Sequence, residues 1–274
     1  MIESFHHDGL TFDVVDAGPE DGEPVVLLHG FPERAGSWGQ VSARLTAQGL
    51  RTLAPDQRGY SPGARPPRRR DYAMPHLVGD VLALIDEVGG SAHVVGHDWG
   101  AAVAWTLAAR HPEACRTLTA VSVPHPAAFL AAMPRGQLLQ SWYMGMFQLP
   151  WLPEQLLSKR GGGLDLALRK GGSTPEDIER LQRDIIDYGA LTGGLNWYRA
   201  LPFAPPSWSR TKVRVPTTFV WSDHDVALGR WGAEHTADWV EADYEFVELA
   251  GVSHWIPTQA PDALAEAILE RVLG

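Results

Sequence analysis

The chain has 274 residues, 45% of them hydrophobic and 20% charged, which is typical of a globular protein with a sizeable core and excludes a mainly disordered chain. A net charge of −10 disfavours nucleic acid and membranes as partners, and no run reaches the ~18 apolar residues of a spanning helix. The single cysteine, Cys115, cannot form an intramolecular disulfide and is expected to be buried; with no secretion signal at the N-terminus, this favours a cytoplasmic location.

The first half of the chain alternates short apolar runs with helical patterns. Asp8 and Gly9 predict the turn of a β-hairpin, because Asp-Gly readily takes the positive φ angles of a two-residue turn. The runs that follow predict strands at 25–28, 52–54, 93–96 and 118–123 and helices at 41–48, 77–88 and 101–110. Strands that are apolar on both faces and alternate with helices predict a parallel sheet covered by helices on both sides.

The pattern changes between residues 124 and 209, where Pro, Met and Trp become frequent and helical patterns are broken by Gly. The predicted organisation is therefore a first core part at 1–123, a helical cap at 124–209, here called the cap segment, and a second core part at 210–274. In the second core part, strands are expected at 217–221 and 244–249 and helices at 232–240 and 263–273. The apolar residues of the cap segment are expected to form either a substrate wall or the core of the cap: Met133, Trp142, Met144, Met146, Phe147 and Trp151.

The segment VVGHDWGAAVAW joins a predicted strand to a helix of small residues and contains Gly96, Asp98 and Gly100. This spacing predicts a strained strand-to-helix turn that presents a nucleophile, because a Cβ on either side of the turn would collide with its neighbours. The N-terminus of the helix favours the charged form of the central carboxylate. An Asp here is also typical of an ordinary helix cap, so a catalytic role needs further residues in support.

Two candidate partners follow predicted strands in the second core part. Asp225 lies in FVWSDHDVAL and His254 lies in ELAGVSHWIP, so that nucleophile, acid and histidine would form a catalytic triad. Asp223 is the alternative acid. The segment LLHGFPE ends another strand, and the backbone N–H groups of Phe31 and Trp99 are expected to form an oxyanion hole.

Five segments resemble the epoxide hydrolases of the α/β-hydrolase fold: HGFP at 29–32, DQRGYSPGARP at 56–66, GHDWG at 96–100, WSDHDVAL at 221–228 and GVSHW at 251–255. The resemblance spans essentially the whole chain and implies that fold, with a mostly parallel sheet flanked by helices and a helical cap insertion. It favours Asp225 over Asp223. Within the cap segment, SWYMGMFQLP and GGLNWYRA match Tyr143 and Tyr198 to the paired cap tyrosines of that family.

The resemblance implies that the protein converts a small apolar epoxide and water into a vicinal diol through a covalent ester on Asp98. Tyr143 and Tyr198 would polarise the ring oxygen, and His254, oriented by Asp225, would activate the water. No cofactor and no metal are expected, because the sequence contains neither a metal-ligand cluster nor a phosphate-binding loop. Many relatives in this family form dimers, so a homodimer is an open alternative for this chain.

Dehalogenation of a haloalkane or haloacid is the nearest alternative, because the same triad displaces halide. Such enzymes hold the leaving halide with Trp or Asn donors, whereas Phe31 stands where they have Asn. Fluoroacetate dehalogenases resemble this chain at the nucleophile turn but have the motif GHDRG there, and Trp99 stands in place of its Arg. A non-catalytic ligand-binding protein of the same fold is less favoured because every expected catalytic position is occupied, and a plain esterase would require Ser at position 98.

Overall fold

The computed structural model describes all 274 residues, and its central feature is one eight-stranded sheet. The strands, in chain order, are β1 (Ser4–His7), β2 (Leu10–Ala17), β3 (Pro24–Leu28), β4 (Arg51–Pro55), β5 (Ala92–His97), β6 (Cys115–Val121), β7 (Thr217–Ser222) and β8 (Tyr244–Leu249). In space their order is β1-β2-β4-β3-β5-β6-β7-β8, and all pairs from β4 onward are parallel. The predicted mostly parallel sheet is confirmed, with an antiparallel edge formed by β1 and β2.

The antiparallel edge begins with the predicted hairpin. His7 pairs with Leu10, which leaves Asp8 and Gly9 as a two-residue turn with φ values of 51° and 72°. Both angles lie in the left-handed region that this type of turn requires, so the prediction is confirmed.

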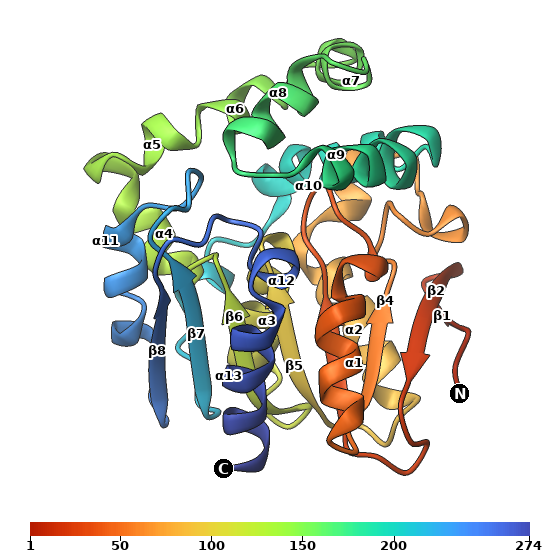
Figure 1. The fold of residues 1–274 in the computed structure, drawn as a ribbon, viewed down its shortest axis with the longest axis vertical. Coiled ribbons are helices and arrows are strands. Elements are labelled where there is room, and N and C mark those ends of the chain that lie inside the picture. Colours follow the sequence, from red (N-terminus) through yellow and green to blue (C-terminus); the bar gives the residue numbers. More distant parts are fainter.

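Helices cover both faces of the sheet, as Figure 1 shows for α1 and α13, which lie side by side on one face. The core helices are α1 (Gly39–Ala47), α2 (Met74–Asp86), α3 (Trp99–Arg110), α11 (Arg230–Glu234), α12 (Ile256–Gln259) and α13 (Pro261–Leu273). Along β3, Val25 and Leu27 belong to the hydrophobic cluster under α1 and α13, whereas Val26 and Leu28 belong to the cluster under α2 and α3. This alternation follows from the two-residue period of a strand and explains why buried parallel strands are continuously apolar.

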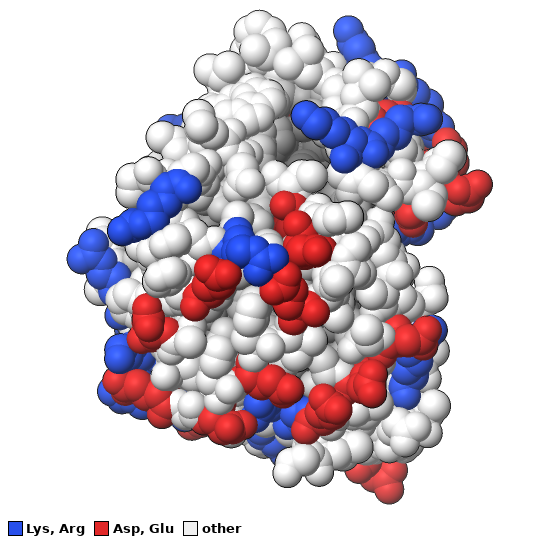
Figure 2. Space-filling model, turned by 60° about the vertical axis from the view of Figure 1, so that its left-hand side comes forward, with Lys and Arg blue, Asp and Glu red and all other residues white.

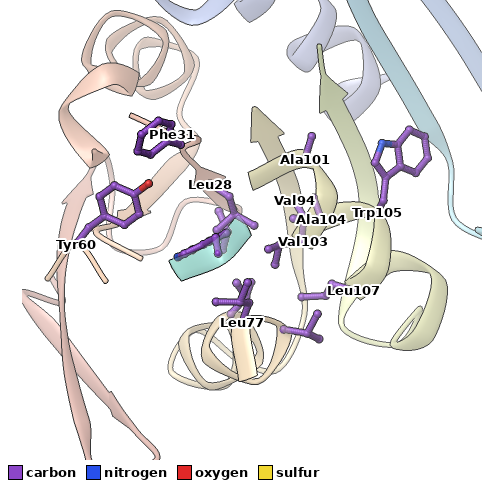
Figure 3. Packing of buried hydrophobic residues seen from close by; sticks show 14 of the residues in the cluster. Leu28, Phe31, Tyr60, Leu77, Val94, Ala101, Val103, Ala104, Trp105 and Leu107 are labelled. Carbon is purple, nitrogen blue, oxygen red and sulfur yellow. The ribbon is translucent and has the colours of Figure 1, made fainter. Parts of the chain in front are cut away.

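Helix α3 packs closely on the sheet because its inner face consists of small side chains. Figure 3 shows Val103 and Ala104 of α3 close to Leu28 of β3 and Leu77 of α2, with Ala101 further along the helix, all of them buried. The close packing fixes the position of the helix N-terminus, and the loop between β5 and α3 is therefore held rigidly.

The chain between β6 and β7 is helical, as predicted. Its helices are α4 (Pro126–Ala132), α5 (Gln137–Gln140), α6 (Trp142–Met146), α7 (Leu152–Leu157), α8 (Gly163–Lys170), α9 (Pro175–Leu181) and α10 (Leu191–Ala200), with a π-helical turn at Gln182–Asp187. In Figure 1 they lie over the end of the sheet at which the parallel strands terminate. The Trp197 indole of α10 donates a hydrogen bond to the Arg58 carbonyl (2.7 Å), which ties the cap segment to the core. The boundaries at 123/124 and 209/210 stay a prediction.

The helix predicted at 232–240 is confirmed at its start and wrong at its end. Helix α11 ends at Glu234, and a separate 3-10 turn occupies Ala237–Trp239. The Thr236 hydroxyl donates to the Gly232 carbonyl and also accepts from the His125 backbone N–H (3.3 Å), so a contact with a distant segment replaces helical continuation.

Two expectations from the sequence concern the burial of Cys115 and the length of apolar helices. Cys115 is the first residue of β6 and is buried, as predicted. No helix combines the length and the apolar character needed to cross a membrane.

Candidate active site

Asp98 lies at the sharp turn between β5 and α3, with a φ of 50° that a non-glycine residue adopts only under strain. A Cβ on Gly96 would collide with the carbonyl of Gly100, and a Cβ on Gly100 would collide with the carbonyl of Leu28. The predicted reason for glycine on both sides of Asp98 is therefore confirmed. The turn leaves the carboxylate 13% exposed.

Three side chains from three loops converge at this turn. His254 Nε2 lies 3.6 Å from Asp98 Oδ2, and His254 Nδ1 lies 2.7 Å from Asp225 Oδ2. The second oxygen of Asp225 accepts the backbone N–H groups of Ala227 (2.8 Å) and Leu228 (2.9 Å). Asp225 is therefore fixed on one side by its own loop and orients the imidazole on the other.

Asp223, the alternative acid, lies elsewhere. Its Oδ1 accepts the backbone N–H of Gly251 (2.7 Å), in the turn that follows β8. It supports the chain leading to His254 but does not contact the imidazole, whereas Asp225 does.

The charges of this cluster depend on one another. Burial would raise the pKa of Asp98, but the hydrogen bond and charge of His254, with the Phe31 amide, hold it below its ordinary value. Burial would likewise lower the pKa of His254, but Asp225 and Asp98 outweigh burial and raise it to about 10. At neutral pH the site therefore holds an imidazolium between two carboxylates.

The two predicted oxyanion donors lie beside the same carboxylate. Strands β3 and β5 are neighbours, with Leu28 paired to Gly96, so the loop after β3 runs past Asp98. The Phe31 backbone N–H donates to Asp98 Oδ1 (2.8 Å). Trp99 is the first residue of α3, where backbone N–H groups have no acceptor within the helix.

A cavity of about 460 Å³ opens above Asp98, and 14 of its 21 lining residues are hydrophobic. Tyr143 of α6 and Tyr198 of α10 line it together with Asp98, and their ring centroids are 6.1 Å apart. Burial and the charge of Asp98 raise the pKa of both phenols, so they stay protonated as hydrogen-bond donors. The structure thus brings both predicted tyrosines to the predicted nucleophile.

Aromatic rings fix Tyr198 in this position. Its ring makes edge-on contacts with Phe147 (4.9 Å), Trp99 (5.0 Å) and Phe31 (5.6 Å between centroids). Such contacts leave little rotational freedom, and the two residues expected to supply backbone amides also wall the phenol with their side chains.

Comparison with known proteins gives the family. A family model described as the alpha/beta hydrolase fold matches residues 23–261. The chain is 38% identical to the AB hydrolase superfamily protein YfhM of Bacillus subtilis, over 96% of this chain and 94% of that protein. It is 32% identical to Epoxide hydrolase A of Mycobacterium tuberculosis, over 97% and 95% of the two chains. The chain belongs to the epoxide hydrolase group of the α/β-hydrolase fold family.

A solved structure agrees with this membership. A structure described among novel epoxide hydrolases from metagenomes of hot environments has a TM-score of 0.84 to this chain at 30% identity, and the match covers 99% of this chain and 98% of that one. The predicted family and the predicted α/β-hydrolase fold are both confirmed.

In this α/β-hydrolase, sequence reasoning missed a buried pair beneath the triad. His97, the last residue of β5, is fully buried, and its Nε2 donates to the His254 carbonyl (2.9 Å). Its Nδ1 faces Glu33 Oε2 at 3.2 Å, and the Glu33 side chain is 1% exposed. The pair therefore supports the loop that carries His254. The sequence offered one indication of this pair, because each member is next to a predicted site segment: His97 directly precedes the nucleophile, and Glu33 is the last residue of LLHGFPE.

The apolar residues of the cap segment divide into three groups. Met133 and Met144 line the cavity, whereas Phe147 is buried and Met146 is partly buried against the core cluster. Trp142 and Trp151 are instead 67% and 65% exposed, so they belong neither to a substrate wall nor to a buried core of the cap. Sequence reasoning failed here because these helices are too short to show which face is buried.

Metal chemistry would need a cluster of protein ligands. In this epoxide hydrolase family member, no group of three or more His, Cys, Asp or Glu side chains is arranged to hold a metal ion. The only carboxylate that lines the cavity is Asp98.

Proposed function

We propose that the protein is an epoxide hydrolase that converts a small apolar epoxide and water into a vicinal diol. The proposal is carried by one observation: a carboxylate at a nucleophile turn shares an apolar cavity with two protonated phenols. A carboxylate suits attack on a saturated carbon because it is nucleophilic without a base to activate it. The relatives named epoxide hydrolase support the same reaction.

In the first step, an Asp98 oxygen attacks one epoxide carbon and the bond from that carbon to the ring oxygen breaks. Tyr143 and Tyr198 donate hydrogen bonds to the ring oxygen, and one phenol gives it a proton as the bond breaks. The resulting phenolate recovers its proton from solvent. The product is a hydroxyalkyl ester on Asp98.

In the second step, His254 removes a proton from a water that attacks the ester carbonyl carbon. Ester formation cancels the negative charge of Asp98, which lowers the pKa of His254, so the imidazolium releases its proton to solvent and the neutral imidazole acts as the base. The N–H groups of Phe31 and Trp99 stabilise the oxyanion. Its collapse breaks the bond to the diol oxygen, which takes the proton held by His254, and the acid proton left on Asp98 then passes to His254, which restores the carboxylate. Asp225 holds the imidazole in orientation.

The cap segment encloses the substrate in this proposal, with domain limits at 1–123, 124–209 and 210–274. It supplies both tyrosines, whereas the core supplies the triad and the two amides. A mainly apolar cavity beneath the cap segment limits the access of bulk water, so the ester is exposed chiefly to the water that His254 activates.

The covalent route is tested by a single turnover in water enriched in heavy oxygen, with enzyme in excess over styrene oxide. The first diol should carry light oxygen from Asp98. His254→Gln should accumulate the ester, seen as the mass of one epoxide on the peptide that contains Asp98. A first-turnover diol whose added hydroxyl carries solvent oxygen, with no adduct on the peptide, would refute the ester. Halide release from haloalkanes and fluoroacetate, measured in parallel, tests the dehalogenase alternative.

A further inference from the structure

The outer surface of the cap segment is unusually apolar. Of the fourteen large hydrophobic side chains that the protein exposes, seven lie within residues 138–166. We call them the outer cap patch: Leu138, Leu139, Trp142, Leu149, Trp151, Leu156 and Leu166. They are carried by α5 to α8 and the intervening turns, which form the row of helices farthest from the sheet in Figure 1. A concentration of this kind marks an interaction surface rather than scattered exposure.

The charge near the outer cap patch is opposite to that of the whole protein. Residues 133–170 contain five Lys and Arg residues and only two acidic residues, although the net charge of the chain is −10. Both acidic residues are engaged, Glu154 with Arg199 and Asp165 with the Gln182 amide. Lys159, Arg169 and Lys170 are exposed and make no ion pair. Figure 2 shows the same trend: red atoms gather in the lower part of this face, and the upper part is mostly white with blue atoms and some red at its right-hand edge.

This combination fits a lipid surface better than a second copy of the chain. A symmetric contact between two outer cap patches would bring the unpaired cations of both copies together. A contact between the patch and an acidic face elsewhere on another copy would be head-to-tail and would give a ring or a filament rather than a pair. Exposed Trp and Leu beside unpaired Lys and Arg are instead the composition of segments that lie in the interface of anionic bilayers.

We propose that the outer cap patch docks on an anionic lipid surface, with Trp and Leu side chains in the interfacial region and the unpaired cations at the headgroups. The proposal goes beyond the reaction and does not rest on it. It also departs from the expectation drawn from net charge, because an average over the chain conceals the charge of the cap segment.

Docking in this way would place the cavity close to the lipid. Helix α6 presents Trp142 to the outside, while the next two residues, Tyr143 and Met144, line the cavity. Leu130 and Leu201 line the cavity and are also 49% and 40% exposed, so apolar surface continues from the cavity to the exterior. Apolar compounds concentrate in bilayers, and a docked protein would take them up from that source.

The test is co-sedimentation of the full chain with 100 nm vesicles of phosphatidylcholine and phosphatidylglycerol at equal ratio, and with vesicles of phosphatidylcholine alone. We expect binding to the anionic vesicles at low salt, weakened by added salt. Leu139→Ser with Trp151→Ser should lower the partition coefficient about tenfold or more through loss of apolar insertion. Arg169→Gln with Lys170→Gln should lower it about tenfold through loss of headgroup attraction.

The matched control for charge is Arg116→Gln with Arg214→Gln, which removes two cations at the N-terminal ends of β6 and β7, away from the cap segment, and should leave binding unchanged. Val15→Ser, at another exposed apolar residue, is the control for insertion. Unaltered thermal unfolding of each variant shows that it is folded.

Three results would overturn docking. They are absence of binding by the unmodified chain, equal loss in the control variants, and a concentration-dependent dimer in light scattering that Leu139→Ser with Trp151→Ser converts to monomer, since the patch would then join two copies. Diol formation from styrene oxide is measured separately. Vesicle binding without diol formation would refute the proposed reaction and leave docking intact.

Discussion

His254 lies between two carboxylates whose roles in the proposed reaction differ. Asp225 is fully buried, is fixed by two backbone amides and forms no covalent bond in the cycle. Asp98 loses its charge whenever it is esterified. The pKa of His254 therefore alternates between a high value in the free enzyme and a lower one in the ester, and the imidazole becomes a base only when there is an ester to hydrolyse.

Asp98→Asn imitates the neutral, esterified state and should lower the pKa of His254. The starting value is about 10, and loss of one adjacent carboxylate charge should reduce it by about 1 to 3 pH units. Nuclear magnetic resonance of labelled histidine over pH 5 to 11 would measure the change.

Protein stability should follow the same titration. Because the folded pKa of His254 lies above its unfolded value near 6.5, its contribution is present in full below pH 6.5 and is lost as pH rises toward 10. The difference in unfolding free energy between the unmodified chain and His254→Gln should shrink over that range. An unchanged His254 pKa in Asp98→Asn would contradict the proposed coupling.

Tyr143→Phe and Tyr198→Phe should slow ester formation while keeping the aromatic packing. Each loses a donor to the developing alkoxide, and general acid catalysis contributes about 10²- to 10⁴-fold, so the double variant should lose activity within that range. Rapid-quench measurement of the ester separates this step from hydrolysis. Tyr188→Phe is the control, since that ring stacks on Arg34 outside the cavity and its loss of a hydroxyl should not alter the rate.

The sequence alone was sufficient to predict the three residues that the structure brings together at the turn between β5 and α3, because each follows a recognisable strand. Asp98 and His254 are 3.6 Å apart although 156 positions separate them. The pair of Glu33 and His97 was not predictable in this way. Each member lies next to a predicted site segment, but the two face each other only because β3 and β5 are adjacent in the sheet, which the sequence does not show.

At the scale of elements, the position of Tyr198 depends on how closely α10 approaches the core. A Cβ on Gly193 would collide with the backbone of Gly59, so only glycine permits this contact. The same helix places Tyr198 over Asp98, and a displacement of α10 would therefore move the phenol away from the substrate.

Gly193→Ala should destabilise the protein by about 1–3 kcal/mol, as overpacking does elsewhere, and should lower the rate of ester formation. Chemical denaturation and rapid-quench kinetics would measure the two effects. Gly145→Ala is the matched control, because Gly145 lies in α6 with open space around its Cβ position. That variant should be neutral or stabilised by up to about 1 kcal/mol. Equal stability of the two variants would refute the close-contact argument.

Elements were predictable where burial imposes a regular pattern. The core strands and α1, α2, α3 and α13 each overlap a predicted segment, because continuous apolar runs and amphipathic periods reflect packing in the sheet layers. The separate short helices of the cap segment and the end of α11 were not predictable. Their limits depend on contacts with distant residues, such as that between Thr236 and His125.

For the whole molecule, the antiparallel edge of the sheet is joined to the core by a buried ion pair remote from the triad. Both Nε and Nη2 of Arg58 donate to Asp80, at 2.7 Å each, and the two side chains are 2% and 7% exposed. His7 of β1 lies 2.7 Å from the same carboxylate. The backbone carbonyl of Arg58 also accepts the Trp197 indole, so one residue connects the edge, the core and the cap segment.

Asp80→Ala should therefore reduce the stability of the whole fold. It leaves the Arg58 guanidinium buried without its bidentate partner, which typically costs about 3–5 kcal/mol, much more than the pair contributes when intact. Denaturant unfolding followed by intrinsic fluorescence would show an earlier midpoint with an unchanged slope, and the residual folded protein should keep its rate of diol formation, because Asp80 touches no residue of the triad. Asp262→Ala removes one member of an exposed pair with Arg44 and should have no measurable effect. If the two variants unfold at the same denaturant concentration, the Arg58–Asp80 pair is not the connection between edge and core that its burial indicates.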